Sequence, residues 1–125
     1  MALQFDITAG FKSDLTAFSS ADQALIAQSL DEWGSRVNVH AGLIPSPVFF
    51  QPRISVLSDE VESSLYGMCI GQRIRLVLTM EHDPLFEQDI WTLIKAVPSN
   101  EFDAAFQCAA GLLYPGLLDE SLKHG

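Results

Sequence analysis

Few cysteines and few basic residues occur in this sequence, and each shortage argues against a class of protein. Cys69 and Cys108 are the only cysteines, and they form neither a Cys-x-x-Cys pair nor a zinc-ligand spacing. We therefore expect two buried reduced thiols instead of a disulfide framework or a zinc site. The 7 lysines and arginines against 16 acidic residues give a formal net charge of −9 at pH 7. Such a charge repels phosphate backbones, so direct binding to free nucleic acid is not expected.

Long apolar runs, repeats and low-complexity tracts are also missing. Without a long apolar run a transmembrane helix is not expected, and the N-terminus lacks the basic and apolar regions of a signal peptide. We therefore expect a cytoplasmic protein with no membrane association. The 125 residues, 48% of them hydrophobic, suit one domain over residues 1–125, with a loose tail from about residue 115. No motif predicts a cofactor. The sequence also lacks the Gly-x-Ser-x-Gly motif, so a hydrolase is not predicted.

The first third of the chain predicts a strand followed by two helices. Apolar residues alternate over residues 3–7, as in a half-buried strand, and recur at helical spacing over residues 11–18. A second helix begins at Ser20, where Ser20 can cap the helix and Gln23 can reach back as in a capping box. Its apolar stripe consists of Ile26, Leu30, Trp33 and Val37.

Residues 64–79 predict an antiparallel hairpin with two different faces. Gly71-Gln72 suits a two-residue type II′ turn, because glycine adopts the positive φ that this turn requires. In the second strand one face is aliphatic, and the opposite face carries two arginines. The aliphatic set is Ile74, Leu76, Leu78 and Met80, and the opposite set is Arg73, Arg75, Val77 and Thr79. We expect the arginine face to be uncovered.

The remaining segments complete an α+β order. Residues 42–52 hold three prolines and predict an extended connection, and residues 53–57 and 89–97 predict strands. Ser99 or Asn100 can cap a last helix with apolar residues at helical spacing up to Leu113. The expected order is strand, helix, helix, a three-stranded antiparallel meander, and helix. We expect two layers, with the helices on one face of a mostly antiparallel sheet.

This order resembles the RelE/ParE superfamily of bacterial toxins. The resemblance is carried by Ser64-Leu65-Tyr66 opening the hairpin, by residues 73–78 closing it, and by the strand-to-helix passage at residues 93–106. It implies the toxin half of a type II toxin–antitoxin pair, or a diverged acidic descendant of one, with a RelE/ParE-like fold. RelE-like members cut messenger RNA on the ribosome, using basic residues on the open sheet face and often a tyrosine in the last helix. ParE-like members inhibit DNA gyrase.

The sequence departs from the ribonuclease pattern at three places. Gly67, Met68 and Cys69 stand where hairpin lysines are expected, Phe106 stands in place of the tyrosine, and residues 98–100 contain no basic residue. Phenylalanine can neither transfer a proton nor stabilise a phosphate. The sequence therefore favours a toxin-family protein that acts by protein binding. A ribosome-dependent endoribonuclease and a non-toxic protein-interaction module are the alternatives, so enzyme activity is left open.

The predicted binding residues are Arg53, Arg73, Arg75 and Lys95, which all lie in the predicted sheet region. Arginine suits bidentate contacts with carboxylates or phosphates. These residues are expected to contact a cognate antitoxin or another acidic protein segment, with a target protein or the ribosome left open. The alternative is a solvated polar sheet face, and the face of Lys95 is also left open.

Two further segments have candidate roles. Glu81, His82 and Asp83, with Glu87 and Asp89 nearby, provide suitable ligand types for a divalent metal but lack a known ligand spacing. We expect a solvated acidic turn, an exposed His82 and no bound metal. Phe49-Phe50 is flanked by prolines, and a contact with a partner or within a homodimer is left open for it.

Overall fold

The computed structural model describes residues 2–39, 41–52 and 63–113, and the structural statements below concern these residues. Arg53, the expected strand at residues 53–57 and the expected C-terminal tail lie outside them.

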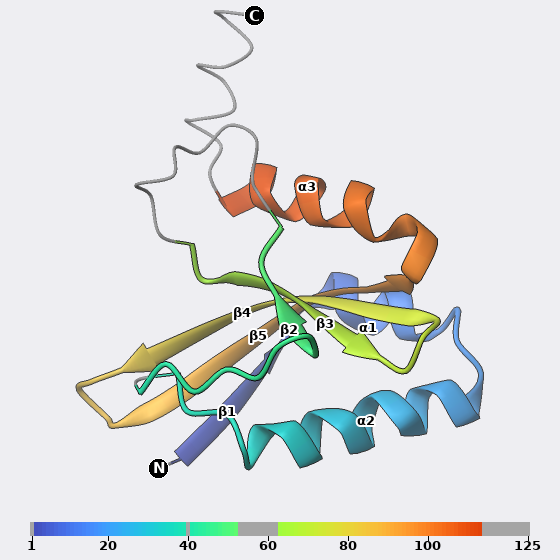
Figure 1. The fold of residues 1–125 in the computed structure, drawn as a ribbon. Helices are drawn as coiled ribbons and strands as arrows, with labels where there is room; N and C mark the ends of the chain where they lie inside the picture. The colour runs from blue at the N-terminus through green and yellow to red at the C-terminus, as the bar shows by residue number, and fades with distance from the viewer. Residues whose placement is uncertain (1, 40, 53–62, 114–125) are drawn as a thin grey trace, which may run out of the picture.

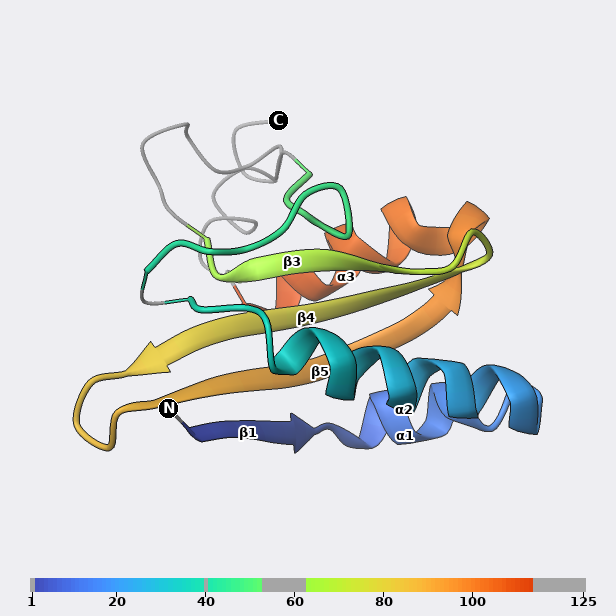
Figure 2. The same cartoon turned by 60° about the horizontal axis from the view of Figure 1, so that its bottom comes forward.

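The described chain folds around one five-stranded sheet with the strand order β1-β5-β4-β3-β2. β1 pairs in parallel with β5, and the other neighbours are antiparallel. The α+β class and the antiparallel β3-β4-β5 meander are therefore confirmed. β1 lies at one edge of the sheet (Figure 2). The elements are β1 (Ala2–Ile7), α1 (Ala9–Leu15), α2 (Ser20–Gly34), β2 (Phe49–Phe50), β3 (Leu65–Ile70), β4 (Ile74–Asp83), β5 (Gln88–Pro98), a 3₁₀ turn (Ser99–Glu101) and α3 (Phe102–Leu113).

The prediction that all helices cover one face of the sheet is wrong. α1 and α2 pack on one face, and α3 packs on the opposite face (Figure 1). The alternating pattern of β4 correctly predicts its aliphatic face, since the aliphatic residues face α1 and α2. The other face is not open, however, because Val77 is fully buried beneath α3 and Thr79 is also buried. The sheet is therefore covered on both faces.

The larger core lies between the sheet and the two N-terminal helices. Trp91 is fully buried there, and the Phe5 and Phe49 rings each meet it nearly edge-on with centroids 5.6 Å apart. Phe49 is 2% exposed, and Phe50 packs on Phe102 of α3. Packing inside the molecule accounts for Phe49, while Phe50 is partly buried and a partner contact through it stays a prediction.

The smaller core lies under α3 and depends on a glycine in β3. The rings of Phe50, Phe102 and Phe106 form a chain, with centroids 5.0 Å and then 5.4 Å apart. A Cβ atom on Gly67 would lie 2.6 Å from the Cζ atoms of both Phe50 and Phe102. Gly67 thus lets two aromatic rings lie directly on the backbone of the sheet.

The turn of the β3–β4 hairpin is one residue longer than predicted. Ile70 pairs with Ile74, so the turn contains three residues, 71–73. Gly71 has the expected positive φ, +61°. The extra residue places Arg73 in the turn instead of in the strand, so the alternation of β4 does not fix the direction of its side chain.

The helix caps also differ from the sequence prediction. Ser19, not Ser20, caps α2 and accepts a hydrogen bond from the Asp22 backbone N–H at 3.1 Å. Gln23 donates to the carbonyl oxygens of Leu15 and Phe18, so it stabilises the α1–α2 connection. A 3₁₀ turn with no side-chain cap precedes α3, because the chain passes directly from β5 into it.

An irregularity in β5 explains the position of Lys95. Val77 pairs with Lys95 while the next residue, Leu78, pairs with Leu93, which leaves an extra residue in β5. Such a bulge frees backbone groups from the ladder. The Asp14 carboxylate of α1 accepts the Ala96 backbone N–H at 3.0 Å. Residues directly opposite one another share a face, so Lys95 lies on the α3 side with Val77.

Candidate protein-binding site

Arg73 lies at the turn of the β3–β4 hairpin and points to the first turn of α2. Its Nη2 atom lies 3.2 Å from Oδ1 of Asp22, and the Arg73 side chain is 79% exposed. The Asp22 side chain is 20% exposed, but a pair whose cation is this exposed adds little to stability, because water screens the charge of Arg73. Arg73 is therefore engaged within the molecule but held weakly.

Arg75 is held by the backbone of the same hairpin. Its Nη1 atom donates to the carbonyl oxygens of Gly71 at 3.2 Å and Ile74 at 2.8 Å. Such bonds satisfy carbonyl groups at the end of the hairpin and fix the guanidinium against it. Arg75 therefore uses its Nη1 atom to bond the hairpin backbone, and the residue is partly buried.

The described basic residues of the prediction do not form one surface. Arg73 contacts α2, which lies on one face of the sheet, whereas Lys95 lies on the α3 face. In the described part of the chain, no hydrogen bond or ion pair involves the Lys95 ammonium group. The expected shared face of Arg73 and Arg75 is therefore wrong, because the longer turn redirects Arg73. That these residues contact a partner stays a prediction.

The positions that differ from the ribonuclease pattern have structural roles. Phe106 lies on the buried side of α3 and is fully buried, and Gly67 provides room for Phe50 and Phe102. Neither position faces solvent with a group that could exchange a proton. With Arg75 bound to carbonyl oxygens, the described residues assemble no cationic site for cleavage of a phosphodiester.

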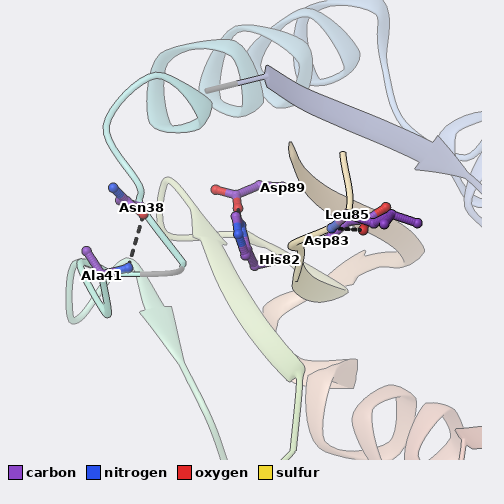
Figure 3. A network of polar contacts seen from close by, with 6 residues as sticks. All are labelled: Asn38, Ala41, His82, Asp83, Leu85 and Asp89. Atoms are coloured by element: carbon purple, nitrogen blue, oxygen red, sulfur yellow. Dashed lines mark hydrogen bonds and ion pairs between the residues drawn. The ribbon is translucent and has the colours of Figure 1, made fainter. Parts of the chain in front are cut away.

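The β4–β5 hairpin ends in a turn that exposes two large apolar side chains. Leu85 is 82% exposed and Phe86 is 71% exposed. The Asp83 carboxylate accepts the Leu85 backbone N–H at 2.9 Å, and Pro84 restricts φ between them (Figure 3). Glu87 completes the turn with φ of +48°. The turn is thus closed by local bonds that leave both apolar side chains outside.

The base of this hairpin is held by a buried polar pair. His82 and Asp89 are opposite one another in the ladder, and Nδ1 of His82 lies 2.9 Å from Oδ1 of Asp89. Their side chains are 16% and 8% exposed, so the expectation of an exposed His82 is wrong. Figure 3 places the pair between the Asn38–Ala41 loop and the Asp83–Leu85 turn. Its position indicates that it fixes the direction in which the hairpin leaves the sheet.

Acidic residues flank the exposed apolar pair along the chain. No lysine or arginine occurs between Arg75 and Lys95, while Glu81 and Glu87 are exposed and Asp83 is partly exposed. Glu81 accepts a hydrogen bond from the Ser64 hydroxyl at 3.1 Å, which fixes its position beside β3. The turn at residues 84–87, together with Glu81 and Asp83, is called the hairpin tip below; it projects from one end of the sheet (Figure 2).

Two hollows occur elsewhere on the described surface. One, of about 580 Å³, lies between β1 and α2 and is lined mainly by apolar residues, with Asp31 at its side. The other, of about 390 Å³, lies beside Asp89 and contains Arg36, Asn38 and Leu43. Neither brings a nucleophile together with a general base, so neither indicates a catalytic site.

The described residues contain no group of three or more histidine, cysteine or acidic side chains that could hold a metal ion. Cys69 is partly buried and Cys108 is exposed, and both are free thiols, so the prediction of burial is wrong for Cys108. Within the same residues, no helix is long and apolar enough to cross a membrane.

Sequence reasoning missed the hairpin tip. Residues 81–84 were assigned to a turn, but the two large apolar residues that follow were given no role. Their signal was present: Leu85 and Phe86 stand between a turn-forming Asp-Pro pair and a strand, where neither alternating pattern includes them. Exposed large side chains in a short turn are candidates for contact with another molecule.

Comparison with known proteins provides no relative. No family model matches the chain, and neither a curated protein nor a solved structure matches it.

Proposed function

We propose that this chain is a RelE/ParE-like toxin-family protein of a type II toxin–antitoxin pair that acts by binding another protein. The order of elements supports this proposal. A hairpin, a further antiparallel strand and a last helix follow two helices, as the resemblance implies. The family assignment itself comes from that resemblance.

The observation that carries protein binding is the exposure of Leu85 and Phe86. The tip presents 82% and 71% of these side chains to solvent while local bonds keep its shape. When a partner covers apolar surface that is otherwise in water, the free energy of the system falls, which favours binding. The Asp83–Leu85 bond and Pro84 restrain the turn, which reduces the conformational freedom that it loses on binding. These properties suit a contact surface.

Binding is favoured over the ribonuclease alternative because the described cations are separated. Arg75 is bound to carbonyl oxygens, and Arg73 contacts a different face of the sheet from Lys95. Charge stabilisation of a transition state requires donors aimed at one point. The proposed toxin therefore acts on its target without cutting RNA.

Induced expression in bacteria tests this proposal. We expect growth to stop while ribosome-bound transcripts stay intact. The double variant Leu85→Ser, Phe86→Ser should restore growth at equal protein level, because it removes the apolar contact. Leu112→Ser is the matched control, since Leu112 is a 73% exposed apolar residue on α3; it should arrest growth as the wild type does.

Normal growth of cells that express the wild-type protein would refute the toxin proposal and favour the non-toxic interaction module. New cuts in ribosome-bound transcripts, lost in Arg73→Ala and Arg75→Ala, would instead support the endoribonuclease.

A further inference from the structure

We infer that the hairpin tip binds a partner protein at an apolar patch bordered by lysine or arginine side chains. This inference rests on the proposed function, because it takes the tip as the binding surface and adds the chemistry of its partner.

The apolar part of the inference follows from the way the tip is built. Leu85 and Phe86 are consecutive, and both remain exposed although the turn is closed by the Asp83–Leu85 bond. At the base, His82 and Asp89 bond across the two strands and lie nearly buried. The tip is therefore supported from within the sheet while Leu85 and Phe86 remain largely exposed. Contacts of this kind, on a rigid support, often provide most of the binding free energy of an interface.

The charged part follows from the surroundings of these two residues. Glu81, Asp83 and Glu87 flank them in the sequence, and the nearest basic residues along the chain are Arg75 and Lys95, toward the far ends of the two strands. In space, Arg36 lines the hollow beside Asp89 at the base of the hairpin, not the turn itself. A partner that covers Leu85 and Phe86 must approach these carboxylates. Positive side chains around its apolar patch would complement them, and negative ones would be repelled.

The same charges argue against a second copy of this chain as the occupant. Each copy carries a net charge of −9. The larger apolar hollow, between β1 and α2, is lined by Asp31, so a tip entering it would bring carboxylates of the same sign together. A basic partner is therefore the better complement.

Peptide probes test the inference with the full chain. One synthetic amphipathic helical peptide carries a leucine stripe flanked by lysines, and its twin carries glutamates at the lysine positions. Binding is measured by fluorescence anisotropy at low and high salt. We expect the lysine peptide to bind and the glutamate peptide not to bind, with affinity for the lysine peptide falling as salt increases.

Variants of the tip then locate the contact. Leu85→Ser with Phe86→Ser should weaken binding of the lysine peptide by about tenfold or more, as expected for a central apolar contact. Asp83→Asn with Glu87→Gln keeps the shape of the tip and should reduce both the affinity and its salt dependence. Glu101→Gln with Asp103→Asn removes two charges at the start of α3 and is the matched control, as is Leu112→Ser. Both controls should bind as the wild type does.

Three results would overturn the inference. If wild type and Leu85→Ser, Phe86→Ser bind the lysine peptide equally, the attraction is only that of an acidic protein for a cation, and the tip fails as a binding surface for the proposed function as well. If both peptides bind equally well and require Leu85 and Phe86, the tip remains the binding surface but the partner need not be basic. If Leu85→Ser, Phe86→Ser abolishes a concentration-dependent dimer of the wild type, the occupant is a second copy. Far-ultraviolet circular dichroism of each variant confirms that it is folded.

Discussion

The β3–β4 and β4–β5 hairpins share strand β4 but end in turns of opposite character. The first turn, at residues 71–73, carries a cation that contacts α2 and is followed by Arg75, which bonds to the carbonyl oxygens of the hairpin. The second turn carries Leu85 and Phe86, whose side chains are more than two-thirds exposed. The first hairpin satisfies its own charged groups, and the second leaves apolar surface uncovered.

The difference bears on where a partner would bind. A charged group that already has a partner within the molecule must give up that contact to bind another protein. This loss reduces the net free energy of binding. Uncovered apolar groups have no such contacts to lose. The β4–β5 hairpin is therefore the better candidate for the contact, although the sequence directs attention to the arginines of the β3–β4 hairpin.

The largest effect on stability is expected from Gly67→Ala in the β3–β4 hairpin. Its Cβ atom would lie 2.6 Å from the Cζ atoms of two phenylalanine rings, so both rings must move out of their packed positions. Overpacking of this kind costs about 1–3 kcal/mol. Urea unfolding measures it, with Gly10→Ala as control, since a Cβ there makes only an ordinary 3.6 Å contact. Equal stability of Gly67→Ala and wild type would show that packing on α3 does not hold this hairpin.

The polar pair at the base of the β4–β5 hairpin gives an effect of comparable size. Asp89→Ala leaves His82 nearly buried without its 2.9 Å partner. Loss of a hydrogen bond to a charged group in such a place costs about 1.5–3 kcal/mol. Amide hydrogen exchange at residues 81–90 should be faster in Asp89→Ala than in the control variant Glu101→Gln. Unchanged exchange there would mean that the tip is held by the turn alone.

Gly71→Ala tests the shape of the first turn. Gly71 has φ of +61°, and the nearest atom to an added Cβ, Cδ2 of Leu25, is 4.0 Å away. Backbone strain is thus the only cost, and we expect a loss of about 1 kcal/mol. Thermal unfolding measures it against Gln72→Ala, which should be neutral. A neutral Gly71→Ala would contradict the turn geometry.

Arg73→Ala should have the smallest effect on stability. Its ion pair with Asp22 is exposed, with the Arg73 side chain 79% accessible, so we expect a loss below about 0.5 kcal/mol. The double cycle with Asp22→Asn isolates the interaction from the role of each residue alone. A coupling free energy well above 1 kcal/mol would show that Arg73 is firmly held and not available to any partner.

Much of the sheet could be predicted because its signals are local. The period-2 alternation in residues 74–80 identified the aliphatic face of β4, and the turn residues marked the hairpins. The position of α3 could not be predicted in this way. The spacing of its apolar residues tells which side of the helix is buried, but not which face of the sheet it covers. The sequence feature that bears on the position of α3 is Gly67, because the absence of a side chain there lets Phe50 and Phe102 lie on the sheet.

The candidate site was harder to predict than the fold. One additional residue in the turn moved Arg73 out of the alternation of β4, and one additional residue in β5 placed Lys95 opposite Val77. Periodicity cannot reveal such insertions, because each reverses the face of the next residues. The exposure of Leu85 and Phe86 depends on how the turn closes, so composition alone assigned that segment to a turn without a role.

Binding of the lysine peptide to two double variants, measured under identical conditions, tests most directly whether Leu85 and Phe86 form the partner contact. Leu85→Ser with Phe86→Ser alters the second hairpin, and Arg73→Ala with Lys95→Ala alters the predicted basic contacts. We predict that the first variant loses about tenfold or more in affinity while the second binds as the wild type does. Unchanged affinity of the first variant for the lysine peptide would contradict the prediction that Leu85 and Phe86 form the contact.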